Sequence, residues 1–355
     1  KECIDAKWIG SDGKYVKLLE NKLSKYIGKK YAIAVSSGSA ALDIAFSAVG
    51  LSRDDEVILP AFTIISCLNP IIRSGAKPVF IDCDLETWNM KVADVEKKIT
   101  KKTKVILAVH IYGLCVDMPK LLKLAKKHKI KVIEDTSEAL GLNINERKCG
   151  SFGDISTFSF YTNKHITTGE GGMILTNKSY IAENCKKLRN LFFDNKKRFY
   201  HRQIGWNYRM SNLNAAVGVA QFENLHKTII LKRKIGNLYY NELKDVNCIK
   251  LQPLKIKYCK NIFWVFGILI KKNKYLNINK IQKHLVNKGI QTRTFFWPLH
   301  KQPLLKKYLK INYSLPNSEY LSQNGIYLPS GLSLKKKQIK LVCKELKKIL
   351  QKLKK

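Results

Sequence analysis

Acidic residues are scarce in this 355-residue chain. Asp and Glu together number 27 against 65 Lys and Arg, which leaves a formal net charge of +38. Such an excess attracts phosphate-bearing partners over long distances. Most of it is lysine scattered along the chain, without the arginine clusters or aromatic-rich basic ribbons typical of nucleic-acid readers. Binding to nucleic acid or another anionic surface is therefore kept as an alternative and is not the main expectation.

The sequence also lacks paired cysteines and a long uninterrupted apolar run. Its nine cysteines form no CxxC or Cys/His spacing, which argues against a zinc site or a disulfide framework. Cys67, Cys83 and Cys343 stand in apolar company, as free thiols do in the core of proteins from reducing compartments. No signal-peptide pattern is present, and the longest apolar stretch, residues 57–72, is interrupted by two prolines. We expect a cytoplasmic protein with no metal and no membrane partner.

Short apolar runs alternate with helical patterns from Tyr31 onward, which predicts an α/β fold. Continuous apolar runs suit parallel strands that are covered on both faces, and ligands of such sheets bind beyond the carboxyl ends of the strands. We predict a large domain over residues 1–225 and a smaller α+β domain over 226–355, which ends in a lysine-rich amphipathic helix from Lys335 to Lys355. The expected strands of the large domain are residues 31–35, 56–59, 78–82, 104–110, 130–135, 156–160 and 172–176.

Two segments follow strands and carry polar groups suited to a ligand. SSGSAAL (residues 36–42) opens a helix with small residues, so backbone amides there are available to a phosphate, although an ordinary N-cap is the alternative. It contains neither the GxxxxGK[ST] nor the GxGxxG pattern. EDTSEALG places Glu134, Asp135 and Glu138 at the end of a buried strand, where an unpaired charge is costly. A protonated pyridine nitrogen would be a suitable partner, and capping of the next helix is the alternative.

The most informative segment is SFYTNKHITTGEGG, which places Lys164 in a turn just after a strand. A lysine must lose its proton before it can attack an aldehyde, and a partly desolvated site lowers its pKa enough to allow this. In a chain with so many lysines, the alternative for any single one is a solvated surface group. The setting of Lys164, in a Gly- and Thr-rich turn, distinguishes it.

Together these segments resemble one family. SSGSAAL, EDTSEALG, SFYTNKHITTGEGGM and GWNYRMSNLNAAVGVAQ occur in the order found in the DegT family of nucleotide-sugar aminotransferases, which depend on pyridoxal 5'-phosphate (PLP). The similarity extends over nearly the whole chain and is strongest to the perosamine-synthase branch. It implies the fold-type-I architecture, whose large domain has a mostly parallel seven-stranded sheet flanked by helices.

The resemblance also implies a role for each site residue. Lys164 would hold PLP through its amine and then move the proton during transfer. Asp135 would pair with the pyridine nitrogen, and Glu138 would lie by the ring hydroxyl. The phosphate would be bound by the amides of Gly38 and Ser39, by the Ser159 hydroxyl and, from the neighbouring subunit of a homodimer, by Asn207.

One position departs from the family pattern. Many relatives have an aromatic residue after the Thr of P-x-x-T, where it stacks on the PLP ring, whereas this chain has Ile64. Phe62 or Trp88 could take that role, or an aliphatic face could suffice. His165, beside the lysine, is expected to pack or form hydrogen bonds and not to act as a catalyst.

The substrate site is predicted from the segment RTFFWPLH. Arg293, Trp297 and His300 resemble the residues that meet the substrate in relatives, and an aromatic ring with cations suits a base and a diphosphate. The alternative is that the aromatic residues 295–297 form the core of a domain interface.

The resemblance implies amino transfer from an amino acid, L-glutamate, to C4 of a nucleotide-linked 4-keto-6-deoxyhexose. The product would be a 4-amino-4,6-dideoxy sugar of the perosamine or viosamine type, used in glycan biosynthesis. A 3-keto-sugar aminotransferase of the same family is the alternative. Some relatives have histidine in place of the lysine and act as 3-dehydratases, and Lys164 argues against that outcome.

Overall fold

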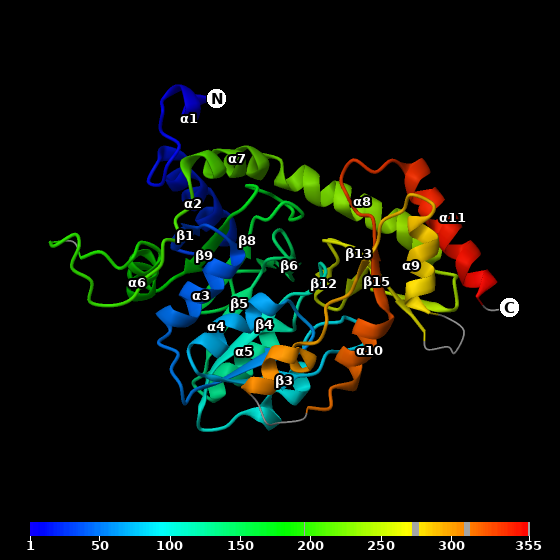
Figure 1. Ribbon diagram of the computed structural model, residues 1–355, viewed down its shortest axis with the longest axis horizontal. Coiled ribbons are helices and arrows are strands. Elements are labelled where there is room, and N and C mark those ends of the chain that lie inside the picture. Colours follow the sequence, from blue (N-terminus) through cyan, green and yellow to red (C-terminus); the bar gives the residue numbers. More distant parts are fainter. Residues whose placement is uncertain (195, 272–276, 309–312, 354–355) are drawn as a thin grey trace.

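The central sheet has seven strands, in the order β1-β9-β8-β5-β4-β2-β3. The computed structural model describes residues 1–194, 196–271, 277–308 and 313–353 (Figure 1). Strand β9 runs antiparallel to both of its neighbours, and the remaining neighbours pair in parallel. The predicted mostly parallel seven-stranded sheet is thus confirmed. Its strands are β1 (Tyr31–Val35), β2 (Glu56–Pro60), β3 (Lys77–Ile81), β4 (Thr103–Val109), β5 (Lys131–Asp135), β8 (Ile155–Ser159) and β9 (Gly172–Thr176).

Helices cover both faces of this sheet, because alternate strand residues point into two separate apolar cores. Ile33 and Val35 of β1 belong to one core and Ala34 to the other. Residues of α3 (Gly38–Ala48), α4 (Asn69–Arg73) and α6 (Ser179–Arg189) fill the first core, whereas α2 (Lys14–Ile27), α5 (Met118–Lys127) and α7 (Asn212–Glu223) fill the second. The continuous apolar runs in the sequence follow from this burial on two sides.

The C-terminal part forms a second, antiparallel sheet in the order β10-β13-β15-β14, packed against α9 and α11. In α11 the apolar positions predicted at helical spacing are buried, and residues 354–355 of the predicted helix lie outside the described residues. The elements of this part are β10 (Ile249–Leu251), β13 (Phe266–Ile270), β14 (Arg293–Thr294), β15 (Gly325–Leu328), α9 (Ile278–Val286), α10 (Pro316–Asn324) and α11 (Lys336–Lys352). Short elements complete the fold: α1 (Glu2–Asp5), β6 (Asn143–Ile144), β7 (Arg147–Lys148), β11 (Lys255–Ile256) and β12 (Cys259–Lys260).

Helix α8 (Leu225–Leu243) joins the two parts (Figure 1). Its first turns contribute Leu225 and Ile229 to the second core of the large sheet, while Ile235 and Tyr239 belong to the core of the small sheet. The predicted domain boundary between residues 225 and 226 falls at the start of this helix and stays a prediction.

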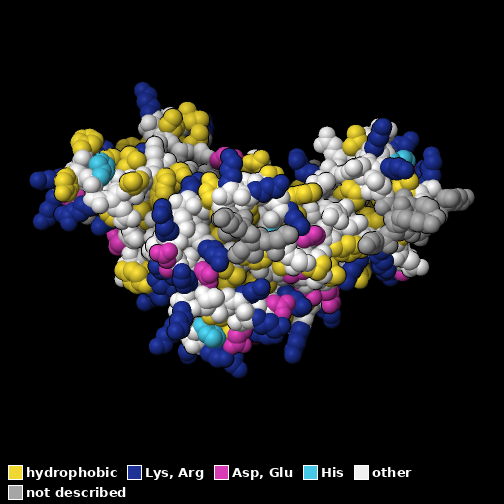
Figure 2. Space-filling model, turned by 60° about the horizontal axis from the view of Figure 1, so that its bottom comes forward, with side chains coloured by type: hydrophobic (Ala, Val, Ile, Leu, Met, Phe, Trp, Pro, Cys, Tyr) yellow, Lys and Arg dark blue, Asp and Glu magenta, His cyan; other side chains and the backbone are white. Residues whose placement is uncertain are grey.

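The basic side chains are spread over the surface. Figure 2 shows Lys and Arg dispersed over one face among scattered acidic groups, without a single dense patch. All nine cysteines are free and buried, including Cys67, Cys83 and Cys343, as predicted. Within the described ranges, no helix is both long and apolar enough to cross a bilayer.

Candidate active site

Lys164 is a buried amine between a carboxylate and an indole ring. It lies in the turn that follows β8, and its side chain is only 13% exposed. The Nζ atom is 3.9 Å from Glu138 Oε1 and 4.0 Å from the centre of the Trp264 ring. Burial lowers the pKa of Lys164, against the opposing effect of Glu138 and Asp135. The amine is therefore closer than an exposed lysine to the neutral form that attacks an aldehyde.

Glu138 faces this amine with few other partners. Its Oε2 accepts the Tyr112 backbone N–H at 2.9 Å. Burial raises the pKa of Glu138 to about 7, although the Lys164 charge and the Tyr112 hydrogen bond act in the opposite direction. A carboxyl group in this state can hold or release a proton near neutral pH.

Asp135 is the last residue of β5 and has one oxygen that is weakly engaged. Its Oδ1 accepts hydrogen bonds from the backbone N–H of Ser137 at 3.0 Å and from the Ser137 hydroxyl at 2.6 Å. Its Oδ2 contacts the Cys67 thiol at 3.5 Å, and a thiol is a weak donor. Oδ2 is thus suited to accept a hydrogen bond from a cationic N–H group.

The N-terminus of α3 forms a close-fitting cradle. The Ser37 side chain caps the helix by accepting the Ala40 N–H, and the amides of Gly38 and Ser39 occupy the first two helical positions, where the helix supplies no acceptor. A Cβ atom at residue 38 would lie 2.7 Å from Ser159 Cβ, so only glycine allows this approach. Two free amides beside a serine side chain fit a phosphate.

A chain of contacts joins the cradle to Asp135, whose charge in turn acts on Lys164. The Ser39 hydroxyl lies 2.8 Å from that of Ser66, which precedes Cys67, and the Cys67 thiol contacts Asp135. The structure therefore brings together an amine that can attack an aldehyde, an acceptor for a ring N–H and a phosphate cradle. This set of groups fits PLP.

The two aromatic residues predicted to stack on the cofactor ring are buried in an aromatic cluster, and their role stays a prediction. Phe62 and Trp88 are fully buried and pack edge-on against the Tyr112 ring. Ile64, in contrast, is 47% exposed and directly precedes the short helical turn that carries Ser66 and Cys67. The position that holds an aromatic residue in many relatives is thus an accessible aliphatic side chain here.

Sequence reasoning missed Trp264 and Tyr112. The Trp264 ring covers the Lys164 amine, its Nε1 donates to the Asn163 carbonyl at 2.9 Å, and its face stacks on Tyr112. The run FWVFGILI (residues 263–270) is typical of a strand, and nothing in its pattern indicates which residue reaches a turn about a hundred positions earlier.

Lys164 lines a cationic pocket of about 1380 Å³. Among the described residues that line it, the charged ones are Lys164, Lys232, Lys288 and Arg293, and none is acidic. Arg293, which the sequence predicts to contact the substrate, is among the residues that line this pocket, and its role stays a prediction. An anionic ligand would be attracted into such a pocket.

Trp297 and His300 are not among the residues that line this pocket. Trp297 is 57% exposed and donates from Nε1 to the Lys301 carbonyl, while His300 Nε2 lies 3.0 Å from Glu319 Oε1. Asn207 is exposed, next to a stacked Trp206–Tyr208 pair. The roles of these three residues stay predictions.

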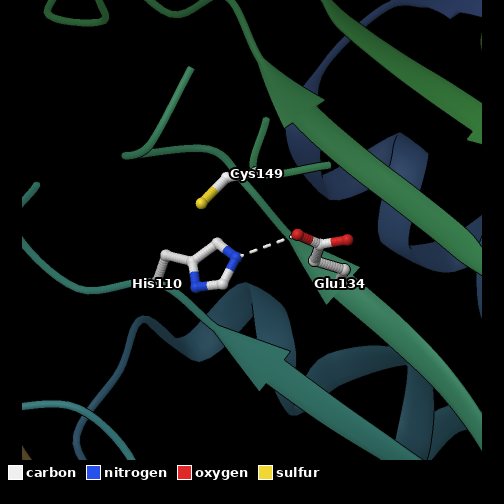
Figure 3. Close-up of side chains that lie close together, drawn as sticks. All are labelled: His110, Glu134 and Cys149. Atoms are coloured by element: carbon white, nitrogen blue, oxygen red, sulfur yellow. Dashed lines mark hydrogen bonds and ion pairs between the residues drawn. The ribbon is translucent and has the colours of Figure 1, made fainter. Parts of the chain in front are cut away.

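His110, Glu134 and Cys149 form a second buried cluster, shown in Figure 3. His110 Nδ1 accepts the Val116 N–H, so Nε2 carries the proton that it shares with Glu134 Oε1 at 3.1 Å. The same carboxylate accepts the backbone N–H groups of Gly150, Phe152 and Gly153. With its imidazole and carboxylate lone pairs engaged in this way, the cluster is explained as a structural hydrogen-bond network.

His165, the residue after Lys164 in the chain, is buried. Burial lowers its pKa to about 3, with a further contribution from the Lys232 charge, so the ring is neutral at physiological pH. A neutral, enclosed imidazole is consistent with the predicted packing role.

Comparison with known proteins assigns the chain to a family. The model of the DegT/DnrJ/EryC1/StrS aminotransferase family matches residues 1–347. GDP-perosamine synthase of Vibrio cholerae is 39% identical over 346 residues, covering 96% of this chain and 92% of that protein. The same enzyme of Escherichia coli O157:H7 is 40% identical over 346 residues, covering 97% and 93%. Among solved structures, PseC of Helicobacter pylori, an aminotransferase involved in pseudoaminic acid biosynthesis, superposes with a TM-score of 0.92 at 26% identity, covering 98% and 94%. The chain belongs to the DegT/DnrJ/EryC1/StrS aminotransferase family, which confirms the predicted family, enzyme class and PLP cofactor.

Proposed function

We propose that this enzyme moves an amino group from L-glutamate to C4 of a nucleotide-linked 4-keto-6-deoxyhexose. The observation that carries the proposal is the buried Lys164 amine, which borders a pocket whose charged lining residues are all cationic. Such a pocket suits the diphosphate of a sugar nucleotide. Full-length similarity to two GDP-perosamine synthases supports a perosamine-type product and makes a GDP-linked sugar the first substrate to test.

Each site residue has a distinct task in this proposal. Bound PLP supplies an electron sink that stabilises negative charge on the carbon next to the transferred nitrogen. The Lys164 amine would hold the cofactor and, once the amino group of the donor has displaced it, would be free to remove a proton from that carbon and return it one position along. Asp135 Oδ2 would accept the ring N–H, and Glu138 would lie by the ring hydroxyl. The Gly38 and Ser39 amides and the Ser159 hydroxyl would hold the phosphate.

We further propose a cytoplasmic homodimer in which Asn207 reaches the phosphate in the partner's site. A loop after α6 projects from the body of the chain (Figure 1), and on it Phe199 is 82% and Ile204 is 85% exposed. Apolar side chains exposed to this degree on a projecting loop suit burial against another subunit. The free, buried cysteines are in keeping with a reducing compartment.

The first test is an absorbance spectrum of the protein with PLP, followed by addition of glutamate. Wild type should show the visible band of lysine-bound cofactor, and glutamate should remove it. Lys164→Ala should lack the band, whereas Lys337→Ala, a change at an exposed lysine of α11, should behave as wild type. No band in wild type, together with salt-dependent binding to DNA, would instead favour the nucleic-acid alternative.

The sugar substrate is identified in a second step. GDP-, UDP- and dTDP-linked 4-keto-6-deoxyhexoses are offered to the glutamate-treated protein, and the product is examined by NMR. Amination at C4 is expected. Amination at C3, with a 3-keto sugar as the better substrate, would replace the proposal with its nearest alternative.

Shared sites can be tested with two inactive variants. In a mixed dimer of Lys164→Ala and Asn207→Ala chains, the Asn207→Ala chain retains Lys164 and receives Asn207 from its partner. One complete site is therefore restored, and mixing should recover activity that neither variant has alone. No recovery after subunit exchange, confirmed by mass, would contradict the role of Asn207.

A further inference from the structure

Lys232 is a second buried lysine beside the active site. It lies near the middle of α8, between the helix residues that pack into the large-sheet core and those that pack into the small-sheet core, and it is only 6% exposed. Its ammonium donates to the carbonyl of Trp264 and to that of Ser330, both at 2.8 Å. Burial lowers the pKa of Lys232 to about 8. Burying an ammonium is costly, and the two hydrogen bonds offset part of that cost. They indicate that the place of the Lys232 ammonium has a role in the protein.

The two carbonyls belong to segments that form the wall of the Lys164 pocket. Trp264 precedes β13 and Ser330 follows β15, and both residues line the pocket together with Lys164 and Lys232. One side chain from α8 thus fixes the backbone of two wall segments from the C-terminal part.

Trp264 transmits this anchoring to the reactive amine. Its backbone is held by Lys232, its Nε1 by the Asn163 carbonyl, and one face of its ring by Tyr112. The ring held in this way lies 4.0 Å from Lys164 Nζ. We propose that Lys232 is a positioning residue of the amino-transfer reaction, which holds the Trp264 indole as a cover over the Lys164 amine.

The consequence for Lys164 depends on two opposing effects of the indole. A ring face attracts the ammonium form by cation–π interaction, whereas exclusion of water favours the neutral amine. Burial is the largest influence on Lys164. Displacing the ring should therefore admit water and return the lysine towards its ordinary, more basic behaviour.

The inference rests on the proposed function, but its test does not require transfer activity. In cofactor-free protein, trace acetic anhydride labels each lysine in proportion to its neutral fraction, and peptide mass spectrometry across a pH series gives the apparent pKa of Lys164. Lys232→Met should raise that value by about one unit, equivalent to a roughly tenfold smaller neutral fraction at a given pH below it.

Lys29→Met is the matched control. Lys29 is 7% exposed, donates to the Gly153 carbonyl and also has a pKa lowered by burial, but it does not line the Lys164 pocket. The Lys29→Met variant should lose stability as Lys232→Met does, but the labelling of Lys164 should be unchanged. An unchanged Lys164 titration in Lys232→Met as well would overturn the proposal.

Three further variants keep the test decisive. Trp264→Ala should reproduce the upward shift, whereas Trp264→Phe, which keeps a ring, should show less of it. If Lys232→Met does not fold, Lys232→Gln is measured in its place; its side chain is one bond shorter and uncharged, so it should hold the two carbonyls less well and give a smaller shift in the same direction. A shift in Trp264→Ala with none in either Lys232 variant would show that Lys232 does not position the ring.

Discussion

Two buried carboxylates, Glu134 in β5 and Glu138 just beyond it, are in opposite electrostatic states. Glu134 accepts hydrogen bonds from His110 and from three backbone amides, and its pKa is lowered despite burial. Glu138 has one backbone donor and a lysine 3.9 Å away, and its pKa is raised to about 7. Burial is the same in kind, so the number of donors decides the outcome. A carboxylate with a full set of hydrogen-bond donors stabilises the fold, and one with few donors is available for chemistry.

Two buried histidines, His110 and His165, show the same contrast in hydrogen bonding. Both ring nitrogens of His110 are engaged, one as acceptor and one as donor, in the network that holds the end of β5. Neither nitrogen of His165 has a well-formed hydrogen bond within the described part of the chain. The network around Glu134 should therefore dominate stability, and the groups around Lys164 should dominate the response to pH.

The largest expected effect is the loss of stability when Glu134, the carboxylate with the full set of hydrogen-bond donors, is removed. Glu134→Ala leaves three backbone N–H groups and His110 without their acceptor, and should lower the free energy of unfolding by about 3–5 kcal/mol. Glu138→Ala leaves the Tyr112 N–H without its acceptor and removes the carboxyl group beside Lys164, and should cost about 1–3 kcal/mol. Urea denaturation of the cofactor-free protein measures both, and equal losses would break the comparison.

A smaller effect is expected from His165 in acid. Its pKa is lowered from 6.5 to about 3 in the folded chain, so the unfolded chain binds more protons between these values. The stability that neutral His165 contributes is complete above pH 6.5 and is lost as the pH falls towards 3. His165→Leu should lose less stability than wild type over that interval, as measured by thermal unfolding at fixed pH values. Parallel pH curves for the two proteins would contradict the assignment.

The smallest effect concerns Glu138 and has the opposite direction. Its pKa is raised from 4.5 to about 7 on folding, so the folded chain binds more protons between these values. The resulting stabilisation is complete below pH 4.5 and is lost as the pH rises through 7. Relative to Glu138→Gln, cofactor-free wild type should become less stable from pH 4.5 to pH 7. An increase over this range would show that the Lys164 attraction outweighs burial.

Much of the large sheet follows directly from the sequence. The predicted strands at 31–35 and 172–176 have the observed bounds of β1 and β9, and the other five differ by one residue or so at their ends. Burial on both faces explains why apolar runs were so informative. Hydrogen bonding decides where a strand ends, and this is not written in the apolar pattern.

The site residues could be predicted only where they lie close to a strand in the sequence. Asp135 ends a strand, and Glu138, Lys164 and the α3 cradle lie within a few residues after one, so the fold brings them to one edge of the sheet. Trp264 reaches the site from the C-terminal part, and Trp88 and Phe62 are drawn into an aromatic core around Tyr112. Such long-range packing depends on how the two sheets meet, and no short motif records it.

Helix α8 also affects how the protein unfolds on heating. This one continuous helix contributes apolar side chains to the cores of both sheets, with Leu225 in one and Leu243 in the other. Loss of either core removes packing from the same helix, so neither sheet can lose its order while the other remains intact. Heating should accordingly give one calorimetric peak, with both parts disappearing at the same temperature.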